Sequence, residues 1–205
     1  MEAAVFIKGL IIGFSIAAPV GPIGVLCIQR TMNYGRTSGL LTGLGAATAD
    51  GIYGTIAAFG LTIISSFLVS QQFWFGLIGG LFLLYLGVKN FLSTPTKETV
   101  IKGHKGYLYD YLSTVFLTLT NPATILFFVA IFAGLGLGSS QRGILSAFFM
   151  ALGVGIGSAL WWFILSGGVS LFRKKLNSSL LDMINKTSGV VIISFALLAF
   201  ANILH

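Results

Sequence analysis

The sequence predicts an all-α integral membrane protein with six transmembrane helices, arranged as two inverted three-helix repeats with broken first helices. Composition is the first observation behind this prediction, because 56% of the 205 residues are hydrophobic and 8% are charged. The second is that apolar runs of membrane-crossing length recur along the whole chain. The third is that prolines interrupt two of these runs at corresponding positions. Together they favour a helical bundle that faces lipid.

Six apolar runs are long enough to cross a bilayer, at roughly 17 to 25 residues per crossing. The second and fifth are the longest, so we expect them to tilt or to extend past the bilayer. The expected spans are residues 4–28, 39–69, 74–92, 112–134, 143–170 and 187–204. The first repeat then occupies residues 1–92 and the second residues 112–205, with a cytoplasmic linker at 93–111 between them.

Positive charges predict the orientation of the chain. Ten of the 12 Lys and Arg residues fall in three connecting segments, at 30–36, 89–111 and 173–186. Loops rich in Lys and Arg stay in the cytoplasm, so we expect a multi-pass protein of a prokaryotic cytoplasmic (inner) membrane with both termini outside. The net charge of +7 fits this orientation and anionic lipid headgroups, and it does not indicate a nucleic-acid partner.

An odd number of spans per half has a geometric consequence. If the halves share a fold, they insert upside down relative to each other. The segments "GPIGVLCI" at 21–28 and "NPATILFF" at 121–128 each place a proline second in a similar apolar stretch. Proline-interrupted spans at matching positions are the best sequence pointer to the binding site of a transporter.

The first interruption, at Pro19, Gly21 and Pro22, predicts a half-helix that begins inside the membrane. Breaking a helix at that depth frees backbone groups, which a solvated cavity or a polar ligand can satisfy. The free N–H groups near Gly21 to Gly24 carry a partial positive charge that suits a carboxylate. The alternative is an ordinary kink, because Pro and Gly are common in membrane helices.

The second interruption lies in "TNPA" at 120–123. Asn121 is expected to cap a second half-helix, with Pro122 as its first residue and Thr124 in its first turn. If the halves are inverted, this half-helix points at the same site from the opposite direction.

Asp50 is the only acidic residue within a predicted span. At about 1.5 Å per residue from Gly39 it lies roughly 17 Å deep, near the bilayer midplane. A charge there costs about 2.5–3.5 kcal/mol on insertion scales, which makes Asp50 a functional-site hypothesis. Tyr53, one turn further on, could donate a hydrogen bond into a cavity. The alternatives are a protonated Asp50 that only joins two helices, and a Tyr53 hydroxyl satisfied by a neighbouring helix.

Metal, cofactor and enzyme chemistry find little support in the residue pattern. The single cysteine, Cys27, permits no internal disulfide, and both histidines, His104 and His205, lie outside the spans. We therefore expect no cofactor, no metal site and no enzyme activity. A heavy-metal cation exporter and a non-transporting structural membrane subunit remain the alternatives.

The stretch "GFSIAAPVGPIGVLCIQRTMNYGRTSGLLTGLGAATADGIYG" resembles the first two spans of the lysine exporter (LysE/RhtB) family. "NPATILFF" is similar to the Asn-Pro-Lys-x-x-x-Phe-Phe motif of that family. Two departures stand out: "PVGP" inserts a valine into the family's tighter break, and Ala123 replaces the lysine that follows Asn-Pro.

The resemblance implies export of amino acids or similar small polar metabolites from the cytoplasm, driven by a proton or ion gradient. The residues favour a compatible mechanism, in which the two half-helix N-termini hold a carboxylate. Asp50 would meet an ammonium, a proton or a cation, and two inverted halves would rock about the site. The expected partners are a small-molecule substrate, a coupling proton or ion and the lipid bilayer. The substrate, the coupling ion and the oligomeric state, a homodimer included, are left open.

Overall fold

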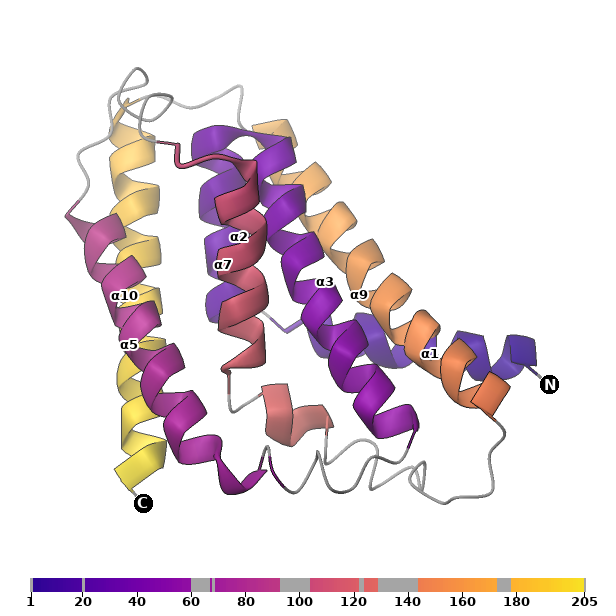
Figure 1. Cartoon of the computed structure of the whole chain (residues 1–205). Coiled ribbons are helices and arrows are strands. Elements are labelled where there is room, and N and C mark those ends of the chain that lie inside the picture. Colours follow the sequence, from indigo (N-terminus) through magenta and orange to yellow (C-terminus); the bar gives the residue numbers. More distant parts are fainter. Residues whose placement is uncertain are drawn as a thin grey trace.

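The computed structural model describes residues 2–19, 21–59, 67, 69–92, 104–121, 124–128, 144–172 and 178–204. Within these ranges the chain is helical apart from short breaks and turns, and no strand is present. Figure 1 shows the helices as a bundle, with α1 (Glu2–Ala17) lying crosswise to the upright helices. The all-α class is therefore confirmed for the described part of the chain.

The chain breaks between α1 and α2 (Pro22–Tyr34), where the prolines predict a break. The two helices are bent by 78° relative to each other. Pro22 sits in the first turn of α2, where a missing N–H leaves no helical hydrogen bond unmade and the fixed φ suits a helix. An ordinary kink bends a helix that continues, whereas here one helix ends at Ala17 and another begins at Pro22.

A single residue, Gly35, joins α2 to α3 (Arg36–Ala58). Its φ is 105°, a conformation that L side chains rarely adopt. Its N–H bonds the Thr31 carbonyl at 3.0 Å, which closes the last turn of α2. Helix α3 consequently begins before the expected residue 39, because no loop separates it from α2.

The remaining labelled helices follow the expected order with shifted ends. The span expected from residue 112 starts earlier, because α7 begins at Tyr107 after Gly106, which has φ of 100°. The structure describes residues 104–111 of the expected linker, and the last five of them are helical. Residues 93–103 lie outside the described residues. These helices are α5 (Gln72–Phe91), α7 (Tyr107–Leu119), α9 (Ile144–Phe172) and α10 (Ser178–Leu204).

Three described helices are long and apolar enough to cross a membrane, namely Phe73–Phe91, Ile144–Phe172 and Asp182–Ala201. The bent pair α1 and α2 makes a fourth if it counts as one span. Helix α7 has only 13 residues, and α3 is rich in Gly, Ala and Thr and includes Asp50. Six spans and their inverted arrangement go beyond these four, so they stay predictions.

Packing places α3 at the centre of the bundle. It packs against α2, α7 and α9, while α5 pairs with α10 and α1 packs along α9. Glycines let the backbones of α1 and α9 approach closely: a Cβ at Gly13 would overlap the Val154 carbonyl, and one at Gly157 would overlap the Leu10 carbonyl. Small residues at such contacts are typical of membrane helices.

Most of the described basic residues gather at one end of the bundle, with Lys8 on α1 as an exception. In Figure 1, α5 and α9 run toward the upper end, whereas α3 and α10 start there and run down. Arg36 starts α3, Lys89 is in the last turn of α5, and Lys105 lies just before α7. We call this upper end the basic end.

Candidate functional site

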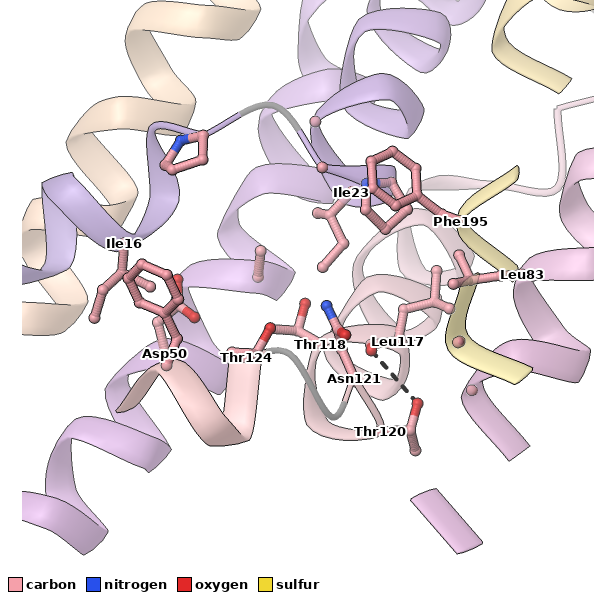
Figure 2. A pocket seen from close by; sticks show the side chains of 18 of the residues that line it. Ile16, Ile23, Asp50, Leu83, Leu117, Thr118, Thr120, Asn121, Thr124 and Phe195 are labelled. Carbon is pink, nitrogen blue, oxygen red and sulfur yellow. Dashed lines mark hydrogen bonds between the residues drawn. The ribbon is translucent and has the colours of Figure 1, made fainter. Parts of the chain in front are cut away.

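A cavity of about 860 Å³ opens between the two interrupted segments. Residues from every labelled helix contribute to its walls, and Figure 2 shows them from close by. The lining comprises Ile16, Ala17, Pro19, Gly21, Pro22, Ile23, Gly24, Ala46, Asp50, Phe73, Gly79, Gly80, Leu83, Leu117, Thr118, Thr120, Asn121, Thr124, Leu126, Phe127, Trp162, Phe195, Leu198 and Ala199.

The first break forms one side of this cavity. Pro19, Gly21, Pro22 and Gly24 all line it, as the sequence predicts. Gly21 has extended backbone angles and no side chain to cap α2, and the first helical bond of α2 runs from the Val25 N–H to the Gly21 carbonyl at 3.1 Å. The N–H groups that precede Val25 in α2 therefore have no acceptor within the helix. The positive end of α2 meets the cavity at this point.

The second break contributes Asn121 and Thr124, which also line the cavity. The Asn121 carbonyl accepts the N–H of Thr124 at 3.1 Å and that of Ile125 at 3.2 Å, so a new helical turn starts here. In Figure 2, Thr118, Asn121 and Thr124 lie close together on one side of the cavity. Pro122, the third predicted residue of this break, lies outside the described residues.

Asp50 lines the same cavity and is 3% exposed. Its Oδ2 accepts a hydrogen bond of 2.6 Å from Ser158 Oγ on α9. Ser158 Oγ in turn accepts one of 3.1 Å from Trp162 Nε1, and Trp162 also borders the cavity. The chain Trp162, Ser158 and Asp50 therefore fixes the carboxylate between α3 and α9.

Tyr53 is not among the residues that line the cavity, although the sequence proposes it for the site. Its side chain is 4% exposed, and its hydroxyl donates to the Leu119 carbonyl at 2.6 Å. That carbonyl belongs to the last turn of α7, where helix carbonyls lack partners in their own helix. The geometry thus matches the alternative, in which a neighbouring helix satisfies the tyrosine.

Sequence reasoning missed several residues of the site: Trp162 lines the cavity, and Ser158, which is not a lining residue, bonds Asp50. Ser158 and Trp162 are one helical turn apart on α9, and that spacing was a usable signal. The apolar wall could not be assigned from sequence, because it comes from helices distant along the chain. Its large members are Phe73, Leu83, Leu117, Phe127, Phe195 and Leu198.

The positive end of α2 and the acidic side chain of Asp50 therefore face one mostly apolar space. The N-terminus of α2 is the positive element, and Asp50 supplies the negative charge when it is ionised. The arrangement suits a small solute that carries both an anionic and a cationic group. Over the ranges that the structure describes, no group of three His, Cys, Asp or Glu side chains is placed to hold a metal ion.

The helix breaks, the cavity between them and the apolar helices fit a membrane transporter. The chain matches the family described as LysE type translocator over residues 14–202, and it belongs to that family. The resemblance seen in the two proline motifs is thereby confirmed.

Three relatives share this similarity. The chain is 28% identical to the "Putative amino acid efflux protein YcgF" of Bacillus subtilis (strain 168), over 93% of this chain and 92% of the relative. It is 31% identical to the "Uncharacterized membrane protein YahN" of Escherichia coli (strain K12), over 52% and 49% respectively. It is 24% identical to the "Uncharacterized membrane protein YrhP" of B. subtilis (strain 168), over 84% and 87%. No solved structure matches the chain.

Proposed function

We propose that the protein exports amino acids or similar small polar metabolites across the cytoplasmic membrane, driven by a proton or ion gradient. One observation carries this proposal: a single cavity is bordered by both helix breaks and by the buried Asp50. The name of the B. subtilis relative, an amino acid efflux protein, agrees with this substrate class.

In the proposed complex, the substrate lies across the cavity. Its carboxylate accepts hydrogen bonds from the N–H groups at the start of α2, near Gly21 to Gly24. Its ammonium group, or the coupling proton or cation, meets Asp50, which Ser158 holds in place. Asn121 and Thr124 offer further polar groups at the second break, and the apolar wall accepts the rest of the substrate.

The pairing of helices supports alternating access by two inverted halves. In such a repeat, α1 with α2 would correspond to α7 with residues 124–128. Helix α3 would correspond to α9, and α5 to α10. A two-fold axis would exchange α3 with α9 and α5 with α10, and the contacts within both pairs are compatible with such an axis. Such an axis does require that α1 pack on α9 as α7 packs on α3, and both contacts are present. Rocking of one half against the other would expose the cavity to each side in turn.

A transport assay tests the proposed function. Cells with and without the protein are loaded with individual amino acids, and the external and internal pools are followed over time. We expect faster efflux of at least one amino acid, which a protonophore should abolish if the coupling ion is a proton. Equal efflux of every amino acid with and without the protein at verified membrane abundance would contradict the proposal.

A further inference from the structure

A second buried charge cluster lies outside the cavity, at the basic end. Its centre is the pair Arg30 on α2 and Asp110 on α7, with Nε and Oδ1 3.4 Å apart. Both side chains are almost fully buried, at 3% and 2% exposure. The pair joins the first part of the chain to the second, because 80 residues separate its members along the sequence.

The Arg30 guanidinium is held from two helices. Nη1 donates to Thr42 Oγ1 on α3 at 3.1 Å, and to the Asp110 carbonyl at 2.9 Å and Thr114 Oγ1 at 3.2 Å on α7. Nη2 donates to Ser113 Oγ, also on α7, at 2.9 Å. The planar fork of arginine makes this many directed bonds possible, and a lysine could not replace it.

The Asp110 carboxylate is held in the same way. Oδ2 accepts the Ser38 hydroxyl of α3 at 2.6 Å and lies 2.7 Å from His104 Nε2. The His104 ring stacks on Tyr34 of α2 at 4.7 Å between centroids. Polar contacts of the cluster thus fasten α2, α3 and α7 to one another.

The cluster lies one to two helical turns beyond the cavity. On α7, Thr114 belongs to the cluster and Thr118, one turn on, lines the cavity. On α3, Thr42 belongs to the cluster and Ala46, again one turn on, lines the cavity. The cluster therefore occupies the layer between the cavity and the basic end.

Ordinary stabilisation is a weak reason for such a pair. Burying two charges costs several kcal/mol per ion, and well-packed apolar residues often stabilise a core as well or better. Polar contacts cost less free energy to separate in the presence of water than their burial suggests, because water replaces each hydrogen bond as the helices move apart. A polar layer can thus open to water where an apolar layer would resist it.

We propose that the Arg30 and Asp110 pair is the gate between the cavity and the basic end. The pair holds α2 and α3 against α7 in the structure described here, and its separation admits solute from that end. The solute that passes the gate is the substrate of the proposed function, and to that extent the gate rests on the proposed function. The closure itself needs only the geometry of the cluster.

Reagent access to the cavity tests the gate. Cys27 is the single native cysteine, so Cys27→Ser supplies a background without reactive thiols. Thr124→Cys then places one reporter in the cavity wall. Its reaction with a membrane-impermeant thiol reagent is measured separately from each side, in right-side-out and inverted vesicles. Asp110→Asn keeps the shape of the side chain but removes the charge that compensates Arg30.

The gate requires that Asp110→Asn raise the labelling rate from the basic end about tenfold or more, because an uncompensated buried guanidinium destabilises the closed arrangement. Labelling from the opposite end should stay equal or fall. Asp182→Asn is the matched control, since it removes the same charge from an exposed pair with Lys186 on α10. It should leave both rates unchanged.

An unchanged rate from the basic end, or an equal rise from both ends, would overturn the gate. If Asp110→Asn does not reach the membrane, Ser113→Ala replaces it, because that change keeps both charges and removes one bond to Arg30. A smaller rise from the basic end is then expected, and no rise contradicts the proposal. Labelling needs no substrate, so a negative labelling result contradicts the gate alone. A negative efflux result contradicts the proposed function.

Discussion

Two buried aspartates in this protein differ in whether a positive charge lies beside them. Asp110 lies beside Arg30 and accepts further hydrogen bonds, so its charge is compensated within the fold. Asp50 accepts one hydrogen bond, from Ser158, and within the described part of the chain no Lys or Arg forms an ion pair with it. In the proposed function, a carboxylate held this way at a cavity wall would exchange a proton or bind a substrate ammonium.

Ser158→Ala should reveal whether Asp50 is charged at rest. A hydrogen bond to a charged group contributes about 1.5–3 kcal/mol and one between neutral groups about 0.5–1.5 kcal/mol. We expect the larger loss at neutral pH, measured as the change in unfolding free energy in detergent. Ser194→Ala is the control, because that hydroxyl is exposed and bonds only its own helix, and it should change stability by less than about 0.5 kcal/mol. A loss in the smaller range would contradict a charged Asp50, and a loss no larger than that of the control would contradict the hydrogen bond itself.

At the scale of elements, the helix breaks are the features that sequence predicts best. Pro22 and Gly21 punctuate the chain by their own backbone chemistry, so the start of α2 needed no tertiary information. The starts of α3 and α7 were less predictable, since they depend on single glycines with positive φ at Gly35 and Gly106.

The polar links between helices could not be predicted from sequence at all. Ser158 meets Asp50 across 108 residues, and Arg30 meets Asp110 across 80. Such pairs depend on how α3 lies against α9 and on how α2 lies against α7. A single sequence without packing information does not determine either. For the same reason the sequence placed Tyr53 by its spacing from Asp50, while packing turned its hydroxyl to Leu119.

The contact of α1 with α9 provides a test at this scale. Gly157→Ala introduces a Cβ that overlaps the Leu10 carbonyl, and overpacking of this kind costs about 1–3 kcal/mol. Gly168→Ala, on the same helix, meets no atom within 4 Å and should be neutral or stabilising by up to about 1 kcal/mol through helix propensity. Melting temperatures of the two variants in detergent compare them directly. Equal melting temperatures would contradict the close approach of α1 and α9.

At the scale of the whole molecule, the charge distribution predicts the orientation in the membrane. The basic end gathers Arg36, Lys89 and Lys105 and is predicted to face the cytoplasm. In the Cys27→Ser background, a cysteine at Gln71 should react with an impermeant thiol reagent on intact cells. A cysteine at Lys105 should react only after the cells are opened. The reverse pattern would overturn the predicted orientation and, with it, the direction of the proposed gate.

The central claim is that Asp50 makes the cavity between the helix breaks a transport site, and Asp50→Asn tests it most directly. Asparagine keeps the size of the side chain and an oxygen that can accept from Ser158, but it removes the charge and the titratable proton. Purified wild-type, Asp50→Asn and Asp182→Asn proteins are compared in proteoliposomes, at equal amounts, for gradient-driven uptake and for exchange of a transported amino acid. The account predicts that Asp50→Asn folds and inserts normally yet loses gradient-driven uptake, while Asp182→Asn stays near wild type. Gradient-driven uptake by Asp50→Asn at the wild-type rate would contradict it.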